Sequence, residues 1–202
     1  MTEYISLVVL FIIAVAVVVL GLMIRSSQKK KGAEEYTATL KAKKRAAKRA
    51  ELAKSIKKIS WSDQFVVDEG VIDKDHQFLF ELINKFNQNV PNYQSAAQMV
   101  PVLTLLTKYT QTHFQREIKL QKAAAYPYIE DHQKEHNDLI AKYNELIKKA
   151  EKANEDNIMD VAAEIGAFLE EWLLNHVVEN DLALKPYVDK MREMATSMGK
   201  IA

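Results

Sequence analysis

Histidines and carboxylates in this sequence recur at the spacing of a helical turn. The chain contains five histidines, which are His76, His113, His132, His136 and His176. His132 lies four residues before His136, and His113 lies four residues before Glu117. Residues four apart lie one above the other on the same face of a helix, so each of these pairs can bind one metal ion from a single helix.

Together with Asp181, which follows His176 by five residues, these side chains offer five imidazoles and two carboxylates. That is more than the four ligands of a tetrahedral zinc ion. The set suits two metal ions of intermediate hardness, with imidazoles as terminal ligands and carboxylates as bridges, and iron fits it best. Any one of these histidines alone is better explained as an ordinary surface or core residue. Because all five fall within four helical stretches, we favour the metal site.

An uncharged run of twenty residues, ISLVVLFIIAVAVVVLGLMI, occupies positions 5–24. As a helix it would span about 30 Å, the thickness of the hydrocarbon core of a bilayer. A cleaved signal peptide is the alternative, but it would need basic residues before a shorter apolar run. Here only Glu3 precedes the run, and Arg25 follows it. We therefore expect residues 1–26 to form a single-pass transmembrane anchor.

Basic residues follow this run directly and none precedes it, which predicts that the C-terminal part is cytoplasmic. Residues 25–58 contain 13 Lys/Arg and 3 Asp/Glu, a net charge of +10, whereas residues 59–202 carry a net charge of −8. We expect residues 27–58 to be a basic helical linker with Gly32 as its only candidate breaker. It could be a solvated spacer or could bind anionic lipid headgroups. Nucleic-acid binding is disfavoured because no base-stacking aromatics are interleaved.

Residues 59–202 form the predicted globular domain. After an extended segment at 61–72, apolar periodicity predicts four helices, at 74–90, 95–122, 129–152 and 158–180. Pro91 marks the end of the first helix, Ser95 is a candidate N-cap for the second, and Pro101 should kink the second helix or delay its start. The fold class expected from these elements is all-α, an antiparallel up-down four-helix bundle.

The antiparallel topology predicts that the candidate ligands meet. His76, His132 and His136 lie near the starts of their helices, whereas His113 and His176 lie toward the ends of theirs. All five should therefore lie at the same end of the bundle. Asp181 is rotated away from His176 on a regular helix, so the fourth helix must end, tighten or bulge between them. The absence of cysteine excludes a thiolate site.

Four motifs, IDKDH (72–76), HFQRE (113–117), HQKEH (132–136) and HVVEND (176–181), resemble those of a bacterial hemerythrin, and the resemblance covers about 61–189. It implies a four-helix bundle that holds a non-heme di-iron centre, with an oxo or hydroxo bridge, and binds O2 reversibly. His132, His136 and His176 resemble the terminal ligands of the saturated iron. His76 and His113 resemble those of the iron with an open position, and Glu117 and Asp181 resemble the bridging carboxylates.

The same resemblance implies an apolar wall around the O2 site, formed by Leu79, Phe114, Trp172, Leu173 and Val177. Two departures concern the entry to the first helix: Asp75 stands where the family often has Gln, and VVDEG (66–70) lacks the usual Val-Gly pair. No histidine has Glu three residues before it, which separates the chain from the di-iron oxygenase and ferritin class.

The favoured function is a membrane-tethered O2-binding protein rather than an enzyme, which stores O2 or delivers it to a membrane-bound oxidase or oxygenase. Three alternatives remain open at this point. They are a sensor of O2 or redox state, a di-iron enzyme acting on peroxide or nitric oxide, and an iron-handling protein.

Overall fold

The computed structural model describes residues 2–199, with the backbone alone at 2–12 and 14. Its described residues are helical without strands and form two compact units, 1–48 and 49–202. The division into an anchor at 1–26, a linker at 27–58 and a bundle at 59–202 stays a prediction.

Helix α1 (Thr2–Ser55) is continuous through the predicted linker. Gly32 does not interrupt it, because the Ala, Lys and Arg residues around this glycine are strong helix formers that offset its cost of about 1 kcal/mol. The last part of the helix is not merely a solvated spacer, since Leu52 and the following Ile56 pack against the core of the second unit.

In the part of the chain whose side chains are described, no helix combines the length and apolar composition needed to cross a bilayer. The predicted span at 5–24 includes residues 5–12 and 14, whose side chains lie outside that part. The predicted anchor is therefore not supported by the described residues and stays a prediction.

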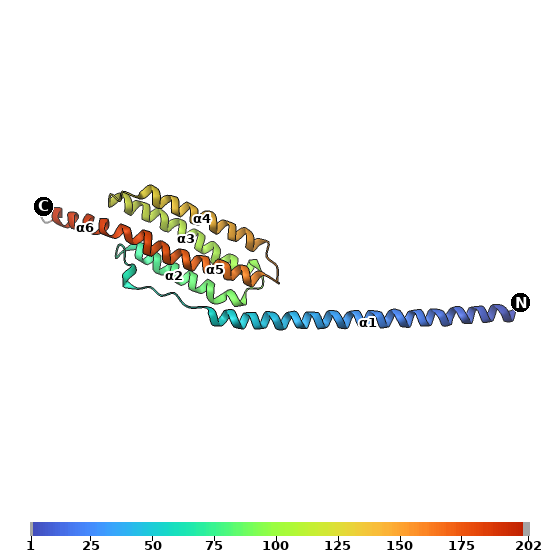
Figure 1. The fold of residues 1–202 in the computed structure, drawn as a ribbon. Helices are drawn as coiled ribbons and strands as arrows, with labels where there is room; N and C mark the ends of the chain where they lie inside the picture. Colours follow the sequence, from blue (N-terminus) through green and yellow to red (C-terminus); the bar gives the residue numbers. More distant parts are fainter. Residues whose placement is uncertain (1, 200–202) are drawn as a thin grey trace. The chain divides into compact units, whose positions relative to one another are not determined.

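Four helices of the second unit pack side by side as a bundle (Figure 1). They are α2 (Val71–Asn89), α3 (Ala96–Ala123), α4 (Ile129–Glu151) and α5 (Ile158–Asn175). Each contacts its neighbour in the chain, and α5 returns to α2, so the helices form a closed ring. The prediction of an all-helical bundle is therefore confirmed.

The connections contain several short irregular helices. They are the 3-10 helices η1 (Asp63–Phe65), η2 (Val90–Asn92) and η4 (Leu182–Leu184), and the π-helix η3 (His176–Asp181). Helix α6 (Lys185–Gly199) follows. Helix α3 begins at Ala96, before Pro101, so the proline does not delay the helix start.

Each helix of the bundle turns an apolar face inward, as in Leu79, Ile83 and Phe86 of α2. Leu106 of α3 and Leu169 of α5 meet them in the same buried cluster. A smaller apolar cluster, which includes Ile72, Tyr126 and Val188, joins the start of α2 to α6. These two clusters hold the helices at fixed register, and helix register decides which side chains meet in the interior.

The segment before α2 is fixed to the bundle by Asn84. Its side-chain amide donates to the Ile59 carbonyl oxygen (2.8 Å), and its Oδ1 accepts from the Ile59 N–H (2.9 Å). All of these groups are buried, so the pairing satisfies backbone groups that water does not reach.

We therefore expect Asn84→Ala to lower the free energy of unfolding by roughly 1–3 kcal/mol, because two buried backbone groups lose their partner. The matched control is Asn89→Ala on the same helix, whose exposed side chain bonds only to Lys85 of its own helix. Its effect should stay within about 0.5 kcal/mol. Urea unfolding followed by circular dichroism measures both, and equal effects would contradict the assignment.

Candidate metal centre

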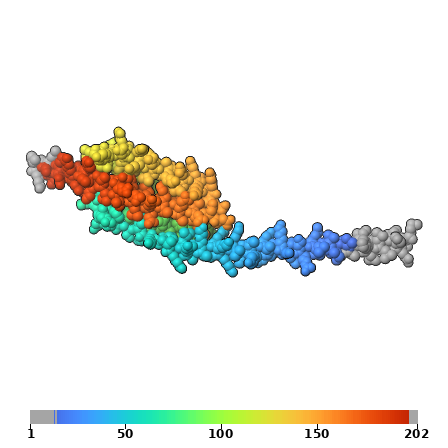
Figure 2. All heavy atoms as spheres, viewed as in Figure 1, coloured from blue at the N-terminus to red at the C-terminus, as the bar shows by residue number. Residues whose placement is uncertain are grey.

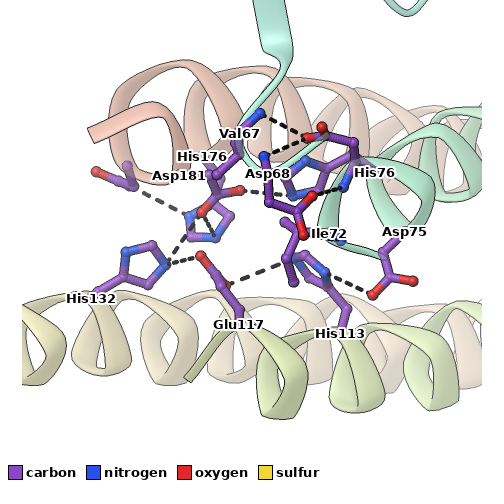
Figure 3. A network of polar contacts seen from close by, with 12 residues as sticks. Val67, Asp68, Ile72, Asp75, His76, His113, Glu117, His132, His176 and Asp181 are labelled. Carbon is purple, nitrogen blue, oxygen red and sulfur yellow. Dashed lines mark hydrogen bonds and ion pairs between the residues drawn. The ribbon is translucent and has the colours of Figure 1, made fainter. Parts of the chain in front are cut away.

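The start of α2 is set by a reciprocal arrangement of two aspartates. The Asp68 carboxylate accepts hydrogen bonds from the N–H groups of Gly70 (2.9 Å), Ile72 (3.2 Å) and Asp73 (3.1 Å). Asp73 in turn accepts from the Val67 N–H (2.8 Å). Side-chain acceptors stabilise the first turn of a helix, where N–H groups have no partner within the helix. This cap fixes the direction from which α2 enters the site (Figure 3).

Five buried side chains from three segments form the larger donor group. They are Glu117 of α3, His132 and His136 of α4, and His176 and Asp181 of η3, whose donor atoms all lie within 4.8 Å of one another. His132 Nε2 lies 3.1 Å from Glu117 Oε1 and 3.3 Å from Asp181 Oδ1. Three imidazoles and two carboxylates therefore converge on one point of the bundle interior.

A second donor group overlaps the first. His76 of α2 and His113 of α3 share Asp181 with it, again with donor atoms within 4.8 Å. His76 Nε2 lies 3.0 Å from Asp181 Oδ2, and His113 Nε2 lies 3.9 Å from Glu117 Oε2. The structure thus brings together all seven predicted residues, and Asp181 faces both groups of imidazoles.

The π-helix explains how His176 and Asp181 reach the same place. A regular α-helix turns about 100° per residue, so a residue five positions on would point well away from the first. Residues 176–181 instead adopt the wider π conformation, and His176 Nε2 lies 3.2 Å from Asp181 Oδ1. The sequence predicted that the helix would end, tighten or bulge here, and the bulge is the observed solution.

Burial and mutual contact set the protonation of this cluster. Burial alone would lower the pKa of His132, but its contacts with Asp181 and Glu117 raise it to about 10. Burial alone would raise the pKa of Asp181, yet His176, His132 and His76 bring it well below its usual range. Burial lowers the pKa of His176 to about 4. Without a metal, then, neutral pH leaves Asp181 charged, His132 protonated and His176 neutral.

Several donor atoms inside the cluster lie 3.0–3.3 Å from a neighbouring imidazole or carboxylate, but they form no hydrogen bond of good geometry among the described residues. They are His76 Nε2, Glu117 Oε2 and both carboxylate oxygens of Asp181, all buried. Buried polar atoms are normally paired, because leaving them unpaired costs free energy. Metal cations would satisfy these atoms, and imidazole and carboxylate donors are the ligands that iron accepts. The residues therefore fit two metal ions bridged by carboxylate.

The predicted apolar wall residues are all buried: Leu79, Phe114, Trp172, Leu173 and Val177. Phe114 stacks on the His136 ring, with centroids 3.5 Å apart and planes 9° apart. Beside Phe114 and Trp172, helices α3, α4 and α5 enclose a cavity of about 100 Å³, which Leu106, Leu139 and Ile140 also line.

Sequence reasoning missed three side chains that touch the donors. Asp75 was noted only as a departure, but its Oδ2 lies 3.4 Å from His113 Nδ1. The buried Gln121 amide lies 3.4 Å from Glu117 Oε1, and its place four residues after Glu117 was a usable signal. The Trp61 ring packs on Phe65 and Phe80, and its centroid also lies 6.2 Å from that of the His76 ring.

Metal loading should release protons. Coordination needs a neutral imidazole, whereas His132 without a metal has a pKa of about 10 and is protonated at pH 7.5. The raised pKa stabilises the metal-free fold below about pH 6.5, and this contribution is lost as pH rises through about 10. We expect at least one proton released per chain when ferrous iron or cobalt binds at pH 7.5, and tighter binding as pH rises toward 10.

Anaerobic calorimetry in two buffers of different ionisation enthalpy counts these protons. His132→Gln should bind little metal and so release few protons, because the pair of ligands on α4 is broken, while Lys134→Ala, an exposed change on the same helix, should leave the number unchanged. Metal binding by the unsubstituted chain without proton release would contradict the assignment.

Known proteins share this domain. The family model of the Hemerythrin HHE cation binding domain matches residues 69–188. Bacteriohemerythrin of Pseudomonas aeruginosa is 29% identical over 140 residues, which is 69% of this chain and 86% of that protein. Bacteriohemerythrin of Stenotrophomonas maltophilia is 27% identical over 132 residues, 65% of this chain and 80% of that protein. Myohemerythrin of Riftia pachyptila is 27% identical over 125 residues, 62% of this chain and 89% of that protein. The chain therefore belongs to the hemerythrin family, whose cofactor is a non-heme di-iron centre that the buried cluster is able to hold.

Proposed function

We propose that this chain is a di-iron protein that binds O2 reversibly and is not an enzyme. The observation that carries the proposal is the position of Asp181, which lies in both a group of three imidazoles and a group of two. Two irons that share this carboxylate would have unequal numbers of protein ligands. The iron with fewer protein ligands keeps a coordination position for a small molecule.

The ligand assignment follows from these groups. We assign His132, His136 and His176 to the saturated iron, and His76 and His113 to the open iron. Glu117 and Asp181 are the bridging carboxylates in this assignment. The distance of 3.9 Å between His113 Nε2 and Glu117 Oε2 supports the assignment of Glu117 as a bridge that also reaches the open iron.

The surroundings favour reversible binding over turnover. When bound, the two irons supply the electrons and the open position for O2. Leu79, Leu173 and Val177 are each at most 1% exposed, so the wall keeps water away from that position. The cavity beside Phe114 and Trp172 is lined mainly by apolar side chains, which suits a neutral diatomic gas better than a charged substrate.

We also propose that residues 5–24 tether the protein to a membrane as a single-pass anchor, with the bundle in the cytoplasm. The described part of this run is strongly exposed, with Val17 at 64% and Met23 at 65% (Figure 2). Exposed apolar surface of this kind marks a site that meets a membrane or another protein. A membrane-bound oxidase or oxygenase that consumes O2 is the client that we propose.

Reversible O2 binding is tested by reducing the iron-loaded chain without air and then adding O2. We expect a charge-transfer spectrum that appears with O2 and disappears when O2 is removed. His113→Ala should lose this spectrum or the open iron first, because that iron has fewer protein ligands. His132→Ala should lose both irons, because the pair of ligands on α4 is broken.

Both variants should keep the helical fold, which circular dichroism checks. Leu105→Ala, at an exposed position of α3, is the control and should retain two irons and the spectrum. If His132→Ala carried two irons and a normal O2 spectrum, the ligand assignment would be wrong. Steady consumption of peroxide or nitric oxide with a reductant would instead favour an enzyme.

The tether is tested with lipid vesicles. The full chain should stay with membranes through a high-salt wash. A fragment of residues 27–202 should bind only vesicles with anionic lipid and dissociate as salt rises, because basic residues each contribute about 1 kcal/mol near such a surface. A fragment of residues 49–202, the compact unit without most of the basic segment, is the matched control and should not bind. Equal binding to neutral vesicles would refute the electrostatic contact.

A further inference from the structure

One buried carboxylate beside the metal centre belongs to neither donor group. Asp75 immediately precedes His76 on α2 and is 2% exposed. Successive residues of a helix point about 100° apart, so Asp75 cannot enter the cluster when His76 does. It faces α3 instead, where three polar side chains surround it.

Those three side chains all come from one face of α3, at positions 109, 113 and 116. Arg116 Nε donates to Asp75 Oδ2 (2.6 Å), and the Tyr109 hydroxyl donates to Asp75 Oδ1 (2.8 Å). His113 Nδ1 lies 3.4 Å from Oδ2. A guanidinium that is always charged and a hydroxyl donor on one carboxyl group favour its charged form, so Asp75 is an anion beside His113.

Figure 3 shows His113 between two carboxylates, with Glu117 on the side of its Nε2 and Asp75 on the side of its Nδ1. The described surroundings of other histidines differ. His76 and His136 have no hydrogen-bond partner at Nδ1, and His176 Nδ1 faces the amide of Asn180 (3.4 Å). Among these four histidines, His113 alone has an anionic partner behind its imidazole, and His76, the other ligand assigned to the open iron, has none.

We propose that Asp75 is a positioning residue that fixes His113 with its proton on Nδ1 and strengthens the bond from Nε2 to the open iron. The inference rests on the proposed di-iron centre. A carboxylate behind a metal-bound histidine selects the tautomer, orients the ring and makes the imidazole a stronger donor. A stronger donor favours ferric over ferrous iron, so Asp75 lowers the reduction potential of the centre and tightens O2 binding.

Arg116 moderates this effect. Its guanidinium shares Asp75 Oδ2 with His113 and withdraws negative charge from the imidazole. Loss of Asp75 and loss of Arg116 should therefore shift the potential in opposite directions. A purely structural link between α2 and α3 would make both variants alter the centre in the same way, through looser packing.

The test compares Asp75→Asn, Asp75→Glu and Arg116→Gln in the full, iron-loaded chain by iron content, reduction potential and O2 dissociation rate. Asp75→Asn should bind O2 about tenfold more weakly and raise the potential, by about 59 mV for a tenfold preference in a one-electron step. Asp75→Glu, which keeps the negative charge, should recover part of the O2 affinity and part of the lower reduction potential. Arg116→Gln should lower the potential. Glu81→Gln, an exposed change on α2 that removes the same charge, should change neither.

Retention of two irons with an unchanged potential in both Asp75→Asn and Arg116→Gln would overturn the inference while leaving the proposed function intact. Shifts of the same sign would also overturn it, since they indicate a structural role only. If Asp75→Asn failed to fold, the sign of the Arg116→Gln shift would still decide. Failure of the unsubstituted chain to bind iron or O2 would instead refute the proposed function.

Discussion

The burial of seven ionisable side chains in the interior of one small bundle is the constraint on which the rest of this structure depends. Each of these groups, alone in an apolar core, would cost several kcal/mol or change its protonation state. Together they can be buried because the attraction between imidazole and carboxylate offsets the free-energy cost of removing each from water. Metal cations satisfy the donor atoms that form no hydrogen bond. The fold must therefore deliver all seven to one point, since a missing member leaves an uncompensated charge.

The need to bring these side chains together explains local backbone features that otherwise cost free energy. Residues 176–181 form a π-helix at the place where a regular α-helical turn would point Asp181 away from His176. The turn before α2 places Glu69 at a φ of 45°, a strained conformation for this residue, while Asp68 satisfies the first N–H groups of the helix. The π-helix contains two of the donors, and the turn at Glu69 precedes the helix that carries His76. The apolar packing of the remaining helices supplies the stability that permits both irregularities.

Much of this arrangement could be predicted from the sequence. The four bundle helices follow from apolar periodicity, and the predicted start at 129 and the predicted start at 158 both agree with the structure. The first helix begins at Val71 rather than at 74, because its first turn is stabilised by side-chain contacts of Asp68 that a periodicity pattern does not contain. The convergence of the donors was predictable because antiparallel topology fixes their depth.

The surroundings of His113 were less predictable for a physical reason. A pair such as His113 and Glu117 lies on one helix, so its spacing alone shows that the two side chains share a face. The contact between Asp75 and His113 joins two helices, and it depends on their relative rotation and depth, which side-chain packing sets. A side chain that contacts a donor from another helix can therefore be found only in the structure, whereas the candidate donors themselves can be predicted from their spacing. The two donor groups differ in imidazole number and in the charge behind one imidazole, so the asymmetry that we propose for the two irons has two separate sources.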